Sequence, residues 1–344
     1  MTSRAAVYRG DKTFSLEQTQ VPPPGADEVQ IKVAYCGICG TDLHIYLGHM
    51  DQRVGFERTI GHEMSGTVAA VGEHVSDFTI GQPVVVRPLD HCADCPACNA
   101  GHEHICHTLK FIGIDTPGAF QDLWNVPSHT IHALPDGLDL SHAALIEPLA
   151  VACHDIERGN VTEGEDVLVI GGGPIGMLVA LVARHAGGNV TISEINANRL
   201  AYAQKLGFAV MNPLETDVAM QIHANTGGKG ADVVFEVSGS QPGVDLMTAA
   251  AATRGRIVMV AIHASKPQID MFQFFWRELE LIGARVYRPE DYDSAMQLLA
   301  EGVVDCDSFI TDIHPLEEIQ QAFESLTSNP NAMKSMIQIA GDVS

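Results

Sequence analysis

The feature of this sequence that most constrains its fold is an alternation of short apolar runs with helix-length segments between residues 166 and 284. Six such runs have the composition of buried strands: 166–170, 190–193, 208–211, 231–237, 256–262 and 279–284. Helix-length segments separate most of them, and 175–186 and 198–206 are the clearest. Because strands that alternate with helices pair in parallel, this block predicts an α/β fold with a six-stranded, doubly wound parallel sheet.

A glycine-rich turn stands between the first of these strands and the first helix. Gly171, Gly173 and Gly176 fit the pattern G-x-G-x-x-G, and Pro174 and Ile175 open the helix. The first glycine permits a tight turn, the second lets the backbone approach a pyrophosphate, and the third allows the helix to pack closely on the strand. The helix N-terminus presents unpaired N–H groups to that anion. The turn therefore favours a Rossmann-type dinucleotide site over a glycine turn without a ligand.

An acidic residue at the end of the next strand indicates which dinucleotide is bound. Glu194 follows Gly176 by eighteen residues. A carboxylate at this place accepts hydrogen bonds from the adenosine ribose and repels a 2′-phosphate, which favours NAD over NADP. Arg199 stands close enough to weaken that preference. We therefore predict NAD as the cofactor, with Glu194 and Arg199 at the ribose.

Charge and hydropathy restrict the partners of the chain. It carries 20 Lys and Arg against 43 Asp and Glu, a net charge of −23, so neither nucleic acid nor an anionic membrane is expected to bind it. No apolar run approaches the roughly 20 residues that span a bilayer, and no signal-peptide pattern follows the first residues. We expect a soluble, cytoplasmic protein whose partner is a small molecule.

Four of the eight cysteines form a compact group with metal-binding spacing. They follow the pattern C-x2-C-x2-C-x7-C: Cys92, Cys95, Cys98 and Cys106. Four thiolates in one loop can complete a tetrahedral zinc site that has no open position, which makes the site structural. A nucleic-acid zinc finger is disfavoured by the charge of −23, and an iron–sulfur cluster is a chemically possible alternative.

A second group of candidate ligands is dispersed. Cys36 and Cys39 are followed by Thr41 and His44, and a Gly-His-Glu triplet stands at 61–63. Taken alone, the Cys-x-x-Cys pair is compatible with a thioredoxin-like redox motif, although the surrounding sequence lacks the helix context of that motif. Each residue alone is compatible with an ordinary core or surface position, so the interpretation depends on the combination.

In combination, the motifs resemble the zinc-dependent medium-chain dehydrogenases in content and order. The segments that carry the resemblance are 36–44, 61–63, the four-cysteine loop, Glu147-Pro148-Leu149-Ala150 and the glycine turn. The similarity is strongest to the polyol (sorbitol and xylitol), 2,3-butanediol and L-threonine 3-dehydrogenase branch. It implies a zinc-binding, GroES-like catalytic domain over 1–148 and 288–344, an NAD-binding Rossmann domain over 149–287, and a homotetramer.

The resemblance also implies roles for individual residues. Cys39, His62 and Glu63 match ligands of a catalytic zinc ion, and Glu147 matches a carboxylate that binds this metal directly or through water. Cys92, Cys95, Cys98 and Cys106 match the structural site, which gives two zinc ions per chain.

Other positions match residues that handle protons and the cofactor. Thr41 matches the hydroxyl that takes the substrate proton, and His44 matches a later member of the relay. Asp42 matches a carboxylate that orients the histidine ligand, whereas Cys36 is expected in the core. The residues implied at the nicotinamide end are Val260, Ala261 and Ile262.

The implied activity is oxidation of a secondary alcohol to a ketone by hydride transfer to NAD, with a polyol, diol, sugar derivative or hydroxy amino acid as substrate. Ile45 stands where sorbitol dehydrogenases carry an aromatic residue, and Tyr287-Arg288 replaces their Arg-Tyr, so the alcohol is left open. The alternatives are a non-catalytic dinucleotide-binding relative and a zinc-free alkene reductase, and the intact ligand set argues against both.

Overall fold

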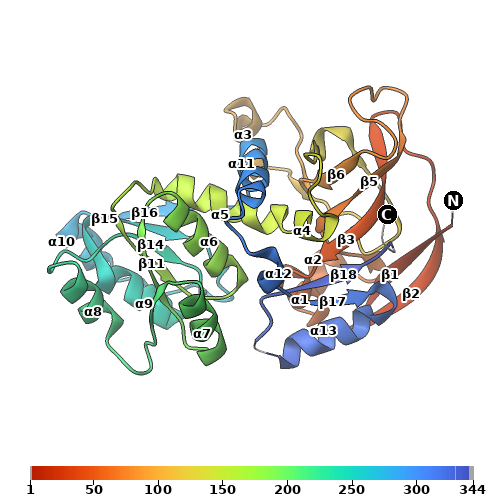
Figure 1. The fold of residues 1–344 in the computed structure, drawn as a ribbon. Coiled ribbons are helices and arrows are strands. Elements are labelled where there is room, and N and C mark those ends of the chain that lie inside the picture. Colours follow the sequence, from red (N-terminus) through yellow and green to blue (C-terminus); the bar gives the residue numbers. More distant parts are fainter. Residues whose placement is uncertain (1, 330, 341–344) are drawn as a thin grey trace. The chain divides into compact units, whose positions relative to one another are not determined.

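The computed structural model describes residues 2–329 and 331–340. The chain divides into two compact units (Figure 1). Unit 1 comprises 1–147 and 288–344, and unit 2 comprises 148–287. No described helix is long and apolar enough to cross a membrane.

Unit 2 is built on a six-stranded sheet in the order β13-β12-β11-β14-β15-β16, and every adjacent pair is parallel. Its strands are β11 (Asp166–Ile170), β12 (Asn189–Ser193), β13 (Ala209–Met211), β14 (Ala231–Glu236), β15 (Ala251–Met259) and β16 (Glu280–Gly283). Its helices are α6 (Pro174–His185), α7 (Ala197–Lys205), α8 (Val218–Asn225), α9 (Gln241–Ala250) and α10 (Met271–Arg277). Helix α5 (Ile146–Gly159) leads into this unit. The predicted α/β fold with a six-stranded parallel sheet is confirmed.

Unit 1 is rich in strands. Its largest sheet runs β10-β6-β5-β3-β18-β17, with β9 also paired to β3, and the smaller sheets are β2-β1-β4 and β7-β8. The strands are β1 (Thr2–Gly10), β2 (Thr13–Gln20), β3 (Glu28–Gly37), β4 (Arg58–Thr59), β5 (Glu63–Val71), β6 (Pro83–Val86), β7 (Leu89–Asp90), β8 (Lys110–Phe111), β9 (Leu123–Pro127), β10 (Ile131–Ala133), β17 (Ile310–Pro315) and β18 (Lys334–Gln338). The helices are α1 (Gly40–Tyr46), α2 (Asp51–Val54), α3 (Pro96–Asn99), α4 (Leu140–Ala143), α11 (Pro289–Ala300), α12 (Cys306–Phe309) and α13 (Ile319–Ser328), with 3₁₀ turns at Glu103–Ile105, Ser128–Thr130 and Leu316–Glu318.

The C-terminal segment returns to the first part of the chain. In Figure 1 the blue strand β18 lies beside the red strand β3, with which it pairs antiparallel. Two helices of this segment, α11 and α13, pack on residues from the first part of the chain. The Tyr292 hydroxyl of α11 donates to the Val86 carbonyl over 3.1 Å, and Phe323 of α13 packs on Phe14 and Tyr46 with ring centroids 4.8 and 5.2 Å away. Both helices therefore complete unit 1.

The expected elements of unit 2 end within a few residues of the observed ones. The largest difference concerns 256–262, because β15 begins at Ala251 and ends at Met259. The chain leaves the sheet at Val260, whose backbone N–H, like that of Ala261, donates over 3.0 Å to the carbonyl oxygen of Glu236. The three residues predicted at the nicotinamide end therefore follow the strand instead of ending it.

Candidate active site

Three potential metal ligands of unit 1 converge where β3 and β5 lie side by side. Cys39 follows β3 and caps α1, while His62 and Glu63 stand at the start of β5. One ligand atom from each lies within 4.8 Å of the others. Gly37 pairs with Glu63 across the two strands, and a Cβ at position 37 would lie 2.3 Å from the Glu63 carboxylate, so a larger residue there would displace that carboxylate. The structure thus gathers residues that are 24 positions apart in sequence.

A buried carboxylate orients this group. Asp42 is fully buried and accepts the Cys39 N–H over 2.9 Å, and its other oxygen lies 3.6 Å from His62 Nδ1. That oxygen and Nδ1 are buried atoms without a hydrogen bond in the described part of the chain. Burial opposes the charged form of His62, but the Asp42 and Cys39 charges outweigh it and raise the pKa of His62 well above its ordinary value. With Nδ1 beside Asp42, the other ring nitrogen of His62 is left to meet Cys39 and a metal ion.

A lysine that the sequence analysis missed completes the group. Lys334, the first residue of β18, has a side chain that is 4% exposed, and its ammonium group pairs with the carboxylate of Glu63. It also donates to the Ile38 carbonyl over 3.3 Å. Burial disfavours the ammonium form, but Glu63 and Cys39 overcome it and raise the pKa of Lys334. The only sequence signal was a lone lysine in the otherwise uncharged and mostly apolar run 332–340.

The other predicted residues of this site lie on α1 and at the start of α5. Thr41 and His44 are three residues apart on α1, and His44 Nδ1 lies 3.2 Å from Nδ1 of exposed His49. Glu147 is 7% exposed and stands outside the close ligand group, yet its charge helps to raise the pKa of His62. Cys36 is fully buried in the core of unit 1, and burial raises the pKa of its thiol, which argues against a redox pair with Cys39.

The four-cysteine loop has the geometry of a tetrahedral metal site. The Sγ atoms of Cys95 and Cys98 lie 3.5 Å apart, those of Cys92 and Cys106 3.5 Å, and those of Cys95 and Cys106 3.9 Å. Zinc–sulfur bonds of about 2.3 Å place the sulfurs of a tetrahedron about 3.8 Å apart. The N–H of His107 donates to Sγ of Cys95 over 3.5 Å and is the main cause that lowers the pKa of Cys95 to about 6. The four sulfur atoms, all within 4.8 Å of one another, are therefore placed as a tetrahedral zinc site requires.

The glycine turn in unit 2 has the backbone that the sequence predicts. Gly171 has φ of +104°, and a Cβ on Gly176 would lie 1.9 Å from the Gly171 carbonyl oxygen. The Glu194 carboxylate closes the turn by accepting the Gly172 N–H over 2.7 Å. Arg199 Nη1 lies 3.9 Å from Glu194 and would be 3.5 Å from a Cβ on Gly173. Glu194 and Arg199 thus both lie beside the turn, and α6 begins at Pro174 with its N-terminus next to it.

The loops after β14 and β15 lie at the same edge of the parallel sheet as the glycine turn. Glu236 is fully buried; it accepts the N–H groups of Ser238 and Gly239 over 3.0 and 3.1 Å, and His263 Nε2 lies 3.1 Å from it. Ile262, the residue before His263, is 90% exposed. These contacts fix the backbone at which the nicotinamide end is predicted.

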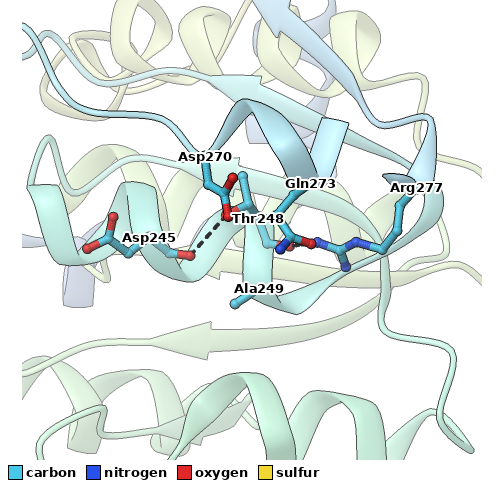
Figure 2. A pocket seen from close by; sticks show the side chains of 6 residues that line it. All are labelled: Asp245, Thr248, Ala249, Asp270, Gln273 and Arg277. Carbon is cyan, nitrogen blue, oxygen red and sulfur yellow. Dashed lines mark hydrogen bonds between the residues drawn. The ribbon is translucent and has the colours of Figure 1, made fainter. Parts of the chain in front are cut away.

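A separate pocket of unit 2, about 590 Å³ in volume, contains none of the predicted residues (Figure 2). It lies between α9 and α10, where the Arg277 guanidinium donates to the Ala251 carbonyl over 2.6 Å and to that of Thr248. Thr248 itself donates to the Asp245 carbonyl, the dashed line in Figure 2. These contacts tie the two helices together and indicate a structural role.

Comparison with known proteins decides the family. Residues 25–136 match the alcohol dehydrogenase GroES-like domain, and residues 174–301 match the zinc-binding dehydrogenase domain. The 2-dehydro-3-deoxy-L-galactonate 5-dehydrogenase of Pseudoalteromonas atlantica is 54% identical over 97% of this chain and 98% of its own. The chain belongs to the zinc-dependent medium-chain dehydrogenase family.

Two further members of the family indicate the kind of substrate and cofactor that such enzymes use. The L-galactonate-5-dehydrogenase of Escherichia coli is 32% identical over 98% of this chain and 99% of its own. The solved structure of a zinc-binding dehydrogenase from Sinorhizobium meliloti, bound to NADP, is 30% identical, has a TM-score of 0.91 and covers 98% of this chain and 99% of that one. This medium-chain dehydrogenase is accordingly an oxidoreductase of secondary alcohols that uses a nicotinamide cofactor.

Proposed function

We propose that this dehydrogenase oxidises a secondary hydroxyl group of a sugar acid, with 2-dehydro-3-deoxy-L-galactonate as the first candidate substrate. The 54% identity over 97% of the chain supports this choice of substrate class. The convergence of Cys39, His62 and Glu63 carries the proposed chemistry, because a relative without catalysis has no need of this ligand set.

In this proposal two zinc ions are held by each chain. The catalytic site uses Cys39, His62 and Glu63, with Glu147 as a direct or water-mediated ligand, and the four-cysteine loop holds the structural ion. Zinc in the catalytic site would act as a Lewis acid that makes the substrate hydroxyl easier to deprotonate. Lys334 holds one oxygen of Glu63, and Asp42 keeps His62 in the orientation that binding requires.

The proton is proposed to leave through α1. The Thr41 hydroxyl accepts it from the substrate, and His44 then receives it one turn further along the helix. The Nδ1 atoms of His44 and His49 lie 3.2 Å apart, and both rings are exposed, so this pair connects the helix with bulk water. A proton therefore has a path to solvent that does not pass through the buried Asp42 and His62.

The cofactor is proposed to be NAD, which accepts the hydride when bound. Gly171, Gly173 and Gly176 shape the turn, α6 presents its N-terminus to the pyrophosphate, and Glu194 receives the ribose hydroxyls. Arg199 beside Glu194 reduces the penalty for NADP, so we expect preference for NAD rather than exclusion of NADP. Val260, Ala261 and Ile262 would face the nicotinamide.

We also propose a cytoplasmic homo-oligomer, a tetramer by family resemblance. Strand β16 is an edge of the unit 2 sheet, and the adjoining helix α10 exposes 60% of Phe272, 79% of Phe275 and 70% of Trp276. Exposed aromatic residues beside an open sheet edge are typical of an interface between subunits. Sedimentation of the wild type and of a Phe275→Glu/Trp276→Glu variant would test the oligomer.

Initial rates of NADH formation across a substrate panel test the proposed activity. The panel contains 2-dehydro-3-deoxy-L-galactonate, L-galactonate, sorbitol, 2,3-butanediol and L-threonine, each with and without a zinc chelator. We expect the sugar acids to give the highest kcat/KM and the chelator to remove the activity. A higher kcat/KM with L-threonine or a neutral polyol would contradict the substrate class, and activity that survives full removal of zinc would contradict the metal chemistry.

A further inference from the structure

Unit 1 contains a pocket of about 350 Å³ in which basic side chains gather despite the acidity of the chain. Its lining residues are Arg87, His91, Gly101, Glu103, His104, Arg288, Pro289 and Glu290. They come from the end of β6, the cysteine loop and the start of α11. Two arginines and two histidines in one pocket stand out in a protein with a net charge of −23.

Arg87 is the decisive residue of this pocket. It is 4% exposed, yet none of the described residues forms an ion pair with it. Its guanidinium makes one long contact, from Nη2 to the His129 carbonyl at 3.4 Å, and its buried Nε has no hydrogen bond within the described chain. A buried charge without a counter-ion costs several kcal/mol, so its retention calls for an anion from outside the chain.

The groups around Arg87 leave that charge uncompensated. Burial, with the positive charge of Arg87, lowers the pKa of His132 to about 4, and burial with His91 and Arg87 also lowers the pKa of His129. Both histidines are therefore neutral near pH 7. Asp90 and Asp293 lie against them, at 3.5 Å from His129 and 3.8 Å from His132, rather than against Arg87.

The start of α11 adds a second cation and a helix N-terminus to the pocket lining. Arg288 caps the 12-residue helix α11, and its backbone N–H donates to Asp291 over 2.6 Å while its Nε lies 3.7 Å from the same carboxylate. Glu290 is exposed and Glu103 half-buried, so water screens these acids more strongly than it screens Arg87. The N-terminus of α11, which carries the positive end of the helix dipole, also lines the pocket through Pro289 and Glu290.

The β5–β6 register places this pocket next to the candidate active site. Ser65 of β5 pairs antiparallel with Val85 of β6, so Arg87, which follows β6, lies near the end of β5 that begins at Glu63. Phe111 contacts the His62 ring with centroids 5.2 Å apart. The next residue, Ile112, donates its N–H over 2.9 Å to the carbonyl of Pro88, which follows Arg87 in the chain. A substrate that reaches the ligand group at one end can therefore present its other end to Arg87.

We propose that the Arg87–Arg288 pocket binds the carboxylate of the substrate and so selects sugar acids over neutral polyols. The inference rests on the proposed function, since it assigns one end of that substrate. Arg87 supplies planar N–H donors that match a carboxylate, and Arg288 adds a second charge to the pocket lining. Ligand binding supplies the counter-ion that none of the described residues gives to Arg87.

The test compares Arg87→Met with Arg254→Gln, a control that removes an exposed arginine from unit 2 and changes the net charge equally. We measure the ratio of kcat/KM for L-galactonate to that for sorbitol. The ratio should fall about 100-fold in Arg87→Met, as expected for the loss of a buried charged contact, and stay constant in the control. An unchanged ratio, or an equal fall in both variants, would overturn the proposal. Arg288→Gln repeats the test if Arg87→Met does not fold.

Direct binding separates this inference from the proposed function. Calorimetry measures the affinities of the wild type for L-galactonate, for neutral galactitol and for galactitol 1-phosphate, none of which requires turnover. Binding of L-galactonate that is lost in Arg87→Met supports the pocket even if no member of the substrate panel is oxidised. Absence of L-galactonate binding overturns the pocket, and tighter binding of the phosphate ester overturns its assignment to a carboxylate.

Thermal unfolding provides a further readout that distinguishes binding from a structural role. Without ligand, Arg87→Met should unfold at the same temperature as the wild type or higher, because it replaces an uncompensated buried charge with an apolar side chain. L-Galactonate should raise the midpoint of the wild type and not that of the variant. A lower midpoint for ligand-free Arg87→Met would show that the arginine stabilises the fold and would contradict the proposal.

Discussion

Replacing Lys334 with methionine should destabilise the protein far more than an ordinary surface substitution. The side chains of Lys334 and Glu63 are 4% and 1% exposed, so the variant leaves a buried carboxylate without its cation. Breaking a buried pair in this way costs about 3–5 kcal/mol. A bound zinc ion would offset part of the cost, since its charge also faces Glu63, and we therefore expect the lower end of this range for the metal-loaded protein.

Chemical and thermal unfolding measure the effect. At roughly 2–4 °C per kcal/mol for units of this size, the midpoint should fall by roughly 6–20 °C. Lys229→Met is the matched control, because Lys229 pairs with Asp232 and Asp166 at 2.7 and 2.8 Å but is 46% exposed, and its loss should cost no more than about 1 kcal/mol. The double variant Lys334→Met/Glu63→Gln should recover much of the lost stability. Equal effects of the two lysine variants, or additive effects in the double variant, would show that the buried Lys334–Glu63 pair is not what stabilises this site.

Three other perturbations have expected outcomes. Because the pKa of His132 is lowered to about 4 in the folded state, the unfolded chain binds more protons between pH 6.5 and 4, and the free energy of unfolding should fall by about 2–3 kcal/mol as the pH is lowered through this range. In His132→Phe, which keeps the stack on Tyr292, urea unfolding should show a weaker dependence on pH. In Gly176→Ala the new Cβ would meet the Gly171 carbonyl at 1.9 Å, so NADH affinity, followed by fluorescence, should fall by at least about 10-fold; unaltered affinity would contradict the geometry of the turn. Cys95→Ser should lower the zinc content by one ion per chain and reduce the thermal midpoint, and an unchanged metal content would contradict the structural site.

The sequence predicts the elements whose signals are local. The alternation of strands and helices predicts the sheet of unit 2. The spacing of the glycines predicts the turn after β11, in which position 176 has no room for a side chain. The same holds for the cysteine loop, because four ligands within fifteen residues leave little choice of geometry.

Residues whose roles depend on distant pairing escaped prediction. Lys334 meets Glu63 because β18 joins the sheet next to β3, a contact across 271 residues that no local pattern encodes. Arg87 follows an apolar strand and has the sequence pattern of an ordinary strand end. Its significance emerges only from its burial and from the absence of an ion-pair partner among the described residues. Both residues are charged and buried, whereas a hydrophobic periodicity predicts that charged residues lie on the surface.

We propose that Cys39, His62 and Glu63 hold a zinc ion on which turnover depends, and that this ion is distinct from the one in the four-cysteine loop. Zinc content, NADH affinity and turnover of 2-dehydro-3-deoxy-L-galactonate in Cys39→Ser test it in one preparation. We expect a decrease from two zinc ions per chain to one, turnover reduced by at least about 1,000-fold, and unchanged NADH affinity. Two zinc ions with wild-type turnover in Cys39→Ser would contradict it.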